Sequence, residues 1–190
     1  MLENRLSSAG EPPSCVRSIL HQRSVYPEWS FGTKAAYDMD LKVTEDEELS
    51  AYLGTFLFQL KDWLAEGKVR SVVLVILSVE SQEGLEMWTF DIDGGSTRAM
   101  QETRSVQEIR NDITAIMRQV MSCVTFLPRL KEKCTFDLLV HADSDTSAST
   151  DWEEAASHEI QNPSKLELLP FATNAHRLNA VVAYKKDLAS

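Results

Sequence analysis

The strongest constraint on the fold is an unbroken apolar run at residues 69–79, with the sequence VRSVVLVILSV. The run is rich in β-branched residues, which favour strands, and apolar residues do not alternate with polar ones. A strand with this pattern is buried on both faces and lies in the interior of a sheet. The rest of the chain must therefore provide neighbouring strands for this one and helices to cover it.

Other segments have the patterns of further strands. Residues 85–92, LEMWTFDI, alternate between apolar and polar positions and follow the turn sequence SQEG. Residues 134–142, CTFDLLVHA, have the same alternation, and two short strand-like pieces lie within residues 168–186. We expect these segments to form the rest of the sheet.

Three segments have helical patterns. The short apolar segment SCVRSILHQR predicts a helix of about three turns, and YPEWSFG after it predicts a loop. Residues 49–64 place apolar side chains on one helical face, with a capping-box pattern at Thr44 and Glu47 before them and a stop at Gly67. A third helix is predicted from about residue 103 to residue 127.

This order of elements predicts an α+β domain, in which helices pack on one face of a mostly antiparallel sheet. With 190 residues, the chain is long enough for one domain with a core of its own. Residues 1–13 are polar and contain Pro12-Pro13, so we assign them to a disordered N-terminal segment and residues 14–190 to the domain.

The composition excludes several classes of partner. The net charge is −10, which does not favour nonspecific binding to nucleic acid or to anionic lipid. No apolar run is long enough to span a membrane, and the first residues do not resemble a secretory signal. Residues 143–167 contain seven acidic residues and one lysine, so they predict an acidic tether between the strand at 134–142 and the closing strands. The three cysteines have unrelated spacings, which indicates reduced thiols in the cytosol or nucleus.

Features that would indicate catalysis or cofactor binding are weak. The loop DGGS at residues 93–96 lacks the spacing and the lysine of a phosphate-binding loop. Asp143 and Asp145 could hold a hard cation, but an acidic solvated loop is the simpler interpretation. The histidines and cysteines do not have zinc-site spacing. We therefore predict no enzymatic activity, no metal and no cofactor; a hydrolase that uses Cys134 with a nearby histidine is the competing hypothesis from another class.

An ordered set of segments resembles one protein family. In chain order they are SILHQRSVYP, LKDWL, WTFDI, RQVMSCVTFLP, CTFDLLVHADSD, DWEE and VVAYK. Together they resemble the HORMA-domain family, in particular its mitotic-arrest-deficient spindle-checkpoint members. The resemblance runs from about Ser18 to Lys185. The polar N-terminal segment departs from the family, whose members have an N-terminal strand and a longer first helix there.

The resemblance implies a two-state mechanism. The C-terminal segment, about residues 150–186, would be a mobile safety belt. In the open state it would cover the sheet edge beside the strand at 134–142, and in the closed state it would pair at the other edge and trap an extended peptide on the vacated strand. Such a protein would be a spindle assembly checkpoint adaptor that delays anaphase. The alternative is a HORMA accessory subunit of a translesion DNA polymerase or of the meiotic chromosome axis.

The resemblance also implies partners, places and residues. The partners would be the kinetochore checkpoint scaffold (a coiled-coil protein), the activator of the anaphase-promoting complex, a second copy in an open–closed homodimer, and an AAA-type remodelling ATPase with its HORMA adaptor. The protein would act in the nucleus, at the kinetochore and in the cytoplasm. Peptide binding is expected of Phe136, Leu138, Leu139, Val140, Trp152, His176, Leu178, Val182 and Tyr184. Dimerisation is expected of Arg118, Gln119 and Phe126.

Overall fold

A six-stranded sheet is the centre of the computed structural model, which describes residues 12–36, 39–93, 105–142, 158, 160–172 and 177–186. The main path of strands is β5-β3-β4-β8-β6, and β7 pairs with β8 beside β6. Every pairing is antiparallel, which confirms the predicted antiparallel sheet, but one of its strands, at residues 164–167, lies inside the segment predicted as a tether. The strands are β3 (Val69–Ser78), β4 (Gly84–Asp93), β5 (Cys134–Ala142), β6 (Ser164–Glu167), β7 (Phe171–Ala172) and β8 (Arg177–Tyr184).

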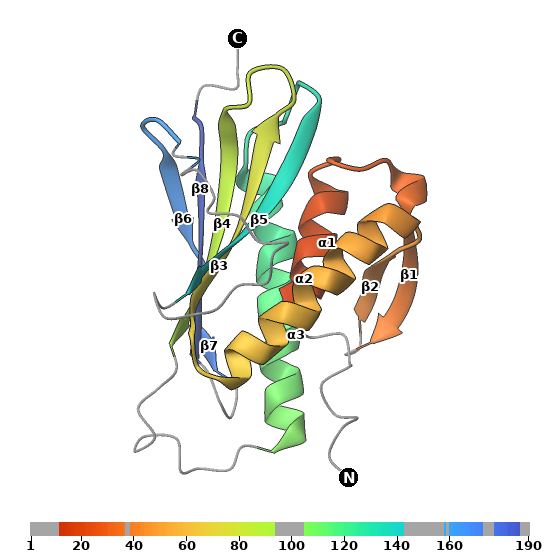
Figure 1. The fold of residues 1–190 in the computed structure, drawn as a ribbon, viewed down its shortest axis with the longest axis vertical. Coiled ribbons are helices and arrows are strands. Elements are labelled where there is room, and N and C mark those ends of the chain that lie inside the picture. The colour runs from red at the N-terminus through yellow and green to blue at the C-terminus, as the bar shows by residue number, and fades with distance from the viewer. Residues whose placement is uncertain are drawn as a thin grey trace.

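The central strand β3 is buried on both faces, as its sequence predicts. Its side chains on the helix face include Leu74 and Ile76, which belong to the main core together with Trp88 of β4. On the opposite face a second, smaller cluster contains Val73, Val75 and Leu77, with Met87 and Leu139 packed against it. The sheet therefore has an apolar surface on each side, and the helices cover one of them (Figure 1).

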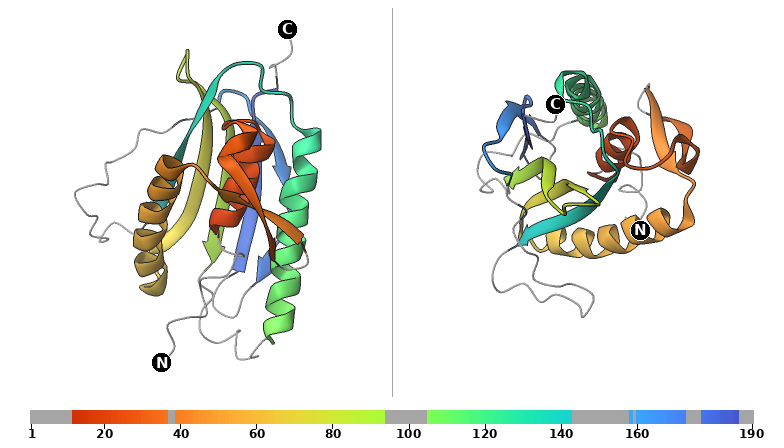
Figure 2. Two further views of the ribbon diagram at one scale, coloured as in Figure 1. Left: turned by 90° about the vertical axis from the view of Figure 1, so that its right-hand side faces the viewer. Right: turned by 90° about the horizontal axis from the view of Figure 1, so that it is seen from above.

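Three helices pack on the first face. They are α1 (Pro12–Gln22), α2 (Glu47–Ala65) and α3 (Val106–Cys123), and short 3-10 turns occur at η1 (Glu28–Ser30) and η2 (Val124–Phe126). The two views of Figure 2 show α2 beside the β5 side of the sheet, with α3 towards the other side. Helix α1 begins at Pro12, inside the segment assigned to the disordered N-terminus, because proline is compatible with the first turn of a helix.

The helix ends follow local chemistry, and one predicted cap is wrong. The side chain of Asp46, and not that of Thr44, caps α2 by accepting a hydrogen bond from the Leu49 N–H at 2.9 Å. Thr44 is instead the last residue of strand β2. At the other end Gly67 has φ +70, and the N–H groups of Gly67 and Lys68 donate back into the last turn, which is a Schellman motif.

A two-stranded hairpin, β1 (Phe31–Ala36) with β2 (Met39–Thr44), was not predicted. Its first residues, Phe31 and Gly32, lie in the segment YPEWSFG, for which the sequence predicts a loop. Phe31 and Leu41 are buried, and the hairpin packs against α1 (Figure 2). An isolated hairpin is marginally stable, so this contact with the helix stabilises it.

Candidate functional site: the open edge of the sheet and the C-terminal segment

Strand β5 forms one edge of the sheet, and among the described residues no strand pairs with its outer side. Beyond the end of β3, the Val79 N–H donates to the Lys133 carbonyl at 2.9 Å, so these two form a hydrogen-bonded pair. Such pairs alternate with non-hydrogen-bonded ones along an antiparallel ladder. The register is unbroken from Ser78 to Val72, so the backbone N–H and C=O groups of Cys134, Phe136, Leu138 and Val140 point away from β3. The edge therefore offers four donor–acceptor sets to another strand.

The side chains of β5 divide between the two faces of the sheet. Phe136 and Leu138 are buried in the main core, and Val140 is partly buried against it. Leu139 packs on the opposite face against the second cluster. These four residues of the predicted peptide site therefore lie together on the edge strand. Their side chains mostly support the strand from within, which leaves the backbone as the exposed binding surface.

The predicted belt residues lie elsewhere. In β8, Val182 is fully buried opposite Trp88, and Tyr184 lies opposite Glu86. Leu178 is opposite Ile92 in the ladder, while Trp152 and His176 fall outside the described residues. Strands β3 and β4 separate β8 from β5, so the structure does not bring the two groups of predicted residues together. β8 occupies the far side of the sheet, the position that the family resemblance assigns to the closed state.

The chain between β5 and β6 contacts the sheet at two described points. His158 Nε2 lies 3.3 Å from Asp137 Oδ2 of β5. A Cβ placed on Gly84, at the start of β4, would lie 3.1 Å from the His158 carbonyl oxygen. Ile160 and Leu168 are buried farther along. The C-terminal segment is therefore attached to β5 and β4 before it enters β6, and Gly84 permits its close approach.

The three predicted dimerisation residues have different environments. Arg118 of α3 is exposed, and Phe126 in η2 is 77% exposed. Gln119 is partly buried, and its Oε1 accepts a hydrogen bond from the Leu169 N–H at 2.7 Å, between β6 and β7. Helix α3 therefore contacts the C-terminal segment through one residue of the pair, while the other remains available to solvent.

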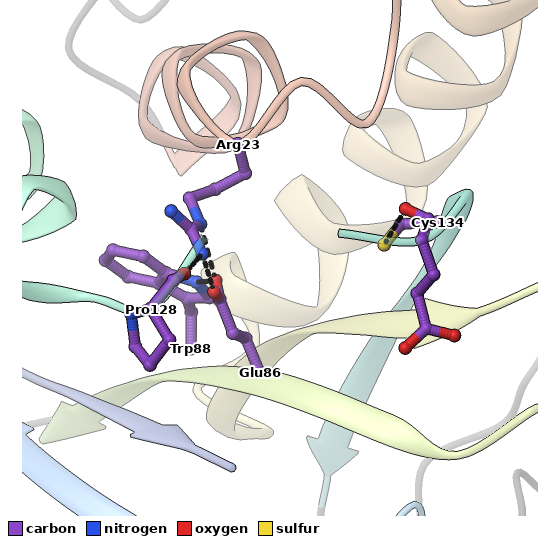
Figure 3. Close-up of polar contacts among 6 residues, drawn as sticks. Arg23, Glu86, Trp88, Pro128 and Cys134 are labelled. Carbon is purple, nitrogen blue, oxygen red and sulfur yellow. Dashed lines mark hydrogen bonds and ion pairs between the residues drawn. The ribbon is translucent and has the colours of Figure 1, made fainter. Parts of the chain in front are cut away.

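A buried ion pair, which sequence reasoning missed, lies beneath β4 (Figure 3). Arg23, just after α1, donates from Nε to Glu86 Oε2 at 3.1 Å, and its Nη2 contacts Glu86 Oε1 and the Pro128 carbonyl. Trp88 Nε1 donates to Glu86 Oε2 at 3.3 Å. Burial raises the pKa of Glu86, while the hydrogen bonds and charge of Arg23 and the hydrogen bond of Trp88 oppose that rise. The sequence signal was an acidic residue in phase with Trp88 and Phe90, on the apolar face of an alternating strand.

The chemistry of the thiols does not support the hydrolase hypothesis. Burial raises the pKa of Cys15 to about 12 and that of Cys123 to about 11. The pKa of Cys134 is also raised, first by burial and then by the charge of Glu132. A nucleophilic cysteine needs a lowered pKa. Within the described ranges no group of histidine, cysteine and acidic residues could hold a metal ion, and no helix is long and apolar enough to cross a membrane.

Comparison with known proteins gives consistent matches. The family model described as HORMA domain matches residues 14–176. The mitotic spindle assembly checkpoint protein MAD2A of Homo sapiens is 40% identical over 173 residues, which cover 90% of this chain and 84% of the human protein. The mitotic spindle checkpoint component MAD2 of Saccharomyces cerevisiae is 34% identical over 174 residues, which cover 90% of this chain and 89% of the yeast protein.

Solved structures agree with the sequence matches. A chain in a crystal structure of the mitotic checkpoint complex is 33% identical and superposes with a TM-score of 0.83, covering 90% of this chain and 93% of that one. HTP-2 of C. elegans bound to the HIM-3 closure motif superposes with a TM-score of 0.72 at 14% identity, covering 90% of this chain and 85% of that one. At this low identity the second likeness extends to the fold alone.

Proposed function

The chain belongs to the HORMA-domain family, in its MAD2 spindle-checkpoint branch, and we propose that it is a checkpoint adaptor that captures an extended peptide on the open edge of β5. The observation that carries the proposal is the position of β8. Because β8 pairs with β4, β5 keeps an edge with four outward-facing N–H and C=O sets. A peptide that adds a strand there gains main-chain hydrogen bonds that no other described strand competes for.

The C-terminal segment would then act as a belt over the bound peptide. It leaves β5, contacts Asp137 through His158, passes Gly84 and pairs again at β8. A peptide between the edge strand and this segment leaves only after the segment moves. The belt therefore slows dissociation of the peptide without a new contact to each peptide residue. A slower dissociation rate is enough to raise affinity, since dissociation rates account for most differences in affinity between related complexes.

The partners proposed are those that the family resemblance implied. The captured peptides belong to the coiled-coil checkpoint scaffold and to the activator of the anaphase-promoting complex, and capture of the activator delays anaphase. Exposed Arg118 and Phe126, with Gln119, form the contact of an open–closed homodimer. An AAA-type ATPase with its HORMA adaptor reopens the belt. The protein acts at the kinetochore, in the nucleus and in the cytoplasm, and its task is binding and not catalysis.

The alternative role in DNA repair or the meiotic axis has weaker support. The relatives that cover 90% of this chain at 34–40% identity are spindle-checkpoint proteins by name. The C. elegans structures match at about 14% identity, which shows the shared fold alone.

The test is amide hydrogen exchange with and without a synthetic scaffold peptide. We expect protection of residues 134–142 to increase on binding, together with a change across residues 150–186. Two matched peptides carry N-methyl groups. The first is methylated on the residues whose N–H faces β5, and the second is methylated on the alternate residues. Only the first should lose binding if pairing with the edge is correct. Unchanged exchange in residues 134–142 at saturating peptide would refute the proposal.

A further inference from the structure

The aromatic side chain of Tyr52 lies beside the open edge of β5, and the proposed function does not use it. Tyr52 of α2 contacts Phe136 in a T-shaped arrangement, with ring centroids 5.7 Å apart and an interplanar angle of 81°. Tyr26 contacts the same ring from another side, at 6.0 Å. The ring of Phe136 is thus fixed between two tyrosines on the helix face of the edge strand.

Tyr52 is unusually exposed for its place on the helix. Leu49 and Phe56, which precede and follow it on the same face of α2, are buried, yet Tyr52 is 46% exposed. Its position explains the difference, because α2 lies along the β5 side of the sheet (Figure 2) and the sheet ends at β5. Nearly half of a tyrosine therefore faces the space where a strand added to β5 would place its side chains.

The hydroxyl group of Tyr52 also interacts with the edge itself. The backbone N–H of Leu138 hydrogen-bonds to it, and this N–H is one of the four that point away from β3. Burial raises the pKa of Tyr52, the hydrogen bond from Leu138 lowers it in part, and the nearby charge of Asp137 raises it. The hydroxyl therefore occupies one of the inner donors of the binding edge in the peptide-free protein.

We propose that Tyr52 is a peptide-contacting residue, with its ring forming the seat for one apolar side chain of the captured peptide. This inference rests on the proposed function. The peptide residue opposite Leu138 directs its side chain to the same face as Leu138, because directly paired residues share a face of the sheet. On that face it meets the exposed surface of the Tyr52 ring. The peptide carbonyl that pairs with the Leu138 N–H replaces the Tyr52 hydroxyl, which is then free to turn to solvent.

The chemistry of the seat fixes the class of side chain it accepts. Leu138 is buried beneath it, and Tyr52 and Phe136 form its aromatic wall. An aliphatic or aromatic peptide side chain removes this surface from water on binding. A carboxylate in the same place would lie close to the charge of Asp137 and lose its own hydration. An extended partner peptide with an apolar residue at this one position, flanked by residues that face the other side, fits the site.

The experiment measures peptide binding to three variants of the full chain by fluorescence anisotropy, with a labelled scaffold peptide as the probe. Tyr52→Ala should weaken binding about tenfold, the scale of a central aromatic contact. Tyr52→Phe keeps the ring and should stay within about threefold of wild type. Phe58→Ala is the matched control, because Phe58 is a 75% exposed aromatic residue of the same helix on another face. It should bind as wild type does.

A double-mutant cycle separates direct contact from a structural effect. Alanine is placed at each peptide residue in turn, and each peptide is titrated against wild type and Tyr52→Ala. Coupling to a single peptide position on the helix face is the expected result. Equal binding by wild type and Tyr52→Ala, or equal loss at every peptide position, would overturn the role of Tyr52 while leaving peptide capture intact. If wild type itself does not bind the probe, the proposed function fails instead.

Discussion

Removing Arg23 while keeping its aliphatic volume should destabilise the protein severely. The perturbation is Arg23→Met, which retains the apolar stem of the side chain and deletes the guanidinium. In the wild type that group donates to both oxygens of Glu86 and to the carbonyl of Pro128. Without it, the Glu86 carboxylate, which is 0% exposed, keeps only the hydrogen bond from Trp88 Nε1 at 3.3 Å.

The expected loss is about 3–5 kcal/mol in the free energy of unfolding, the usual cost of leaving one charge of a buried pair without its partner. A domain of ordinary stability has about 5–15 kcal/mol in total, so the variant should lose a large share of it. The double variant Arg23→Met/Glu86→Gln carries no buried charge, and its amide oxygen still accepts from Trp88. We expect it to be more stable than the single variant by at least about 1 kcal/mol.

The loss in the free energy of unfolding caused by Arg23→Met should also depend on pH. Burial already raises the pKa of Glu86, and losing the opposing Arg23 raises it further. Between the pKa of the unfolded chain and the higher pKa of the folded one, the folded state holds a proton that the unfolded state lacks. Stability therefore falls as pH rises through this window. The single variant should lie closer to wild type at about pH 5 than at about pH 8, and the double variant should not show this trend.

Urea unfolding of the three proteins at both pH values measures these differences, with the slope of the transition as a check on two-state behaviour. A loss below about 1 kcal/mol for Arg23→Met would mean that water or a local rearrangement solvates Glu86. A double variant no more stable than the single one would show that packing, and not charge, is the role of Arg23. Either result would refute the reasoning.

Three smaller predictions concern single residues. Gly67→Ala should cost about 1–2 kcal/mol of stability because φ is +70 there, whereas Gly54→Ala should stabilise α2 by about 1 kcal/mol because nothing lies within 4 Å of the new Cβ. Urea unfolding that gives both substitutions the same sign would contradict this. Ser105→Ala removes the capping box of α3 and should cost about 1 kcal/mol in thermal unfolding; no change would mean that α3 begins later. Arg118→Ala should abolish self-association in sedimentation velocity and leave peptide affinity unchanged; loss of folding would make Arg118 structural.

Hydrophobic periodicity predicted those elements whose pattern lies within a single segment of the chain. The unbroken run in β3 indicated burial on both faces, and alternation identified β4 and β5. The hairpin β1–β2 was missed because its strands contain Gly32, Lys34, Asp40 and Lys42 among few apolar residues. Its stability comes from packing against α1, a contact that no local pattern specifies.

The site was only partly readable from the sequence, for the same reason. The residues of β5 could be assigned to the edge by resemblance, but which of their backbone groups face outward depends on the register with β3. Arg23 and Glu86 are 63 residues apart, so their pairing is a property of the tertiary structure. Tyr52 falls on the apolar face predicted for residues 49–64, and only the position of α2 at the end of the sheet reveals its exposed surface.

The register of β8 connects the ion pair to the binding edge. In this structure β8 lies beside β4, where Tyr184 is opposite Glu86 and Val182 is opposite Trp88; a position beside β5 is the open state of the proposed belt mechanism. If β8 left that position, water would reach β4 from its open side, close to a carboxylate that is fully buried here. Solvation of Glu86 would lower the free-energy cost of its charge, so the carboxylate would depend less on its ion pair with Arg23. The Arg23–Glu86 pair is therefore held most strongly in the arrangement that leaves β5 open. Arg23→Met should change the balance between the two proposed positions of the belt as well as the free energy of unfolding.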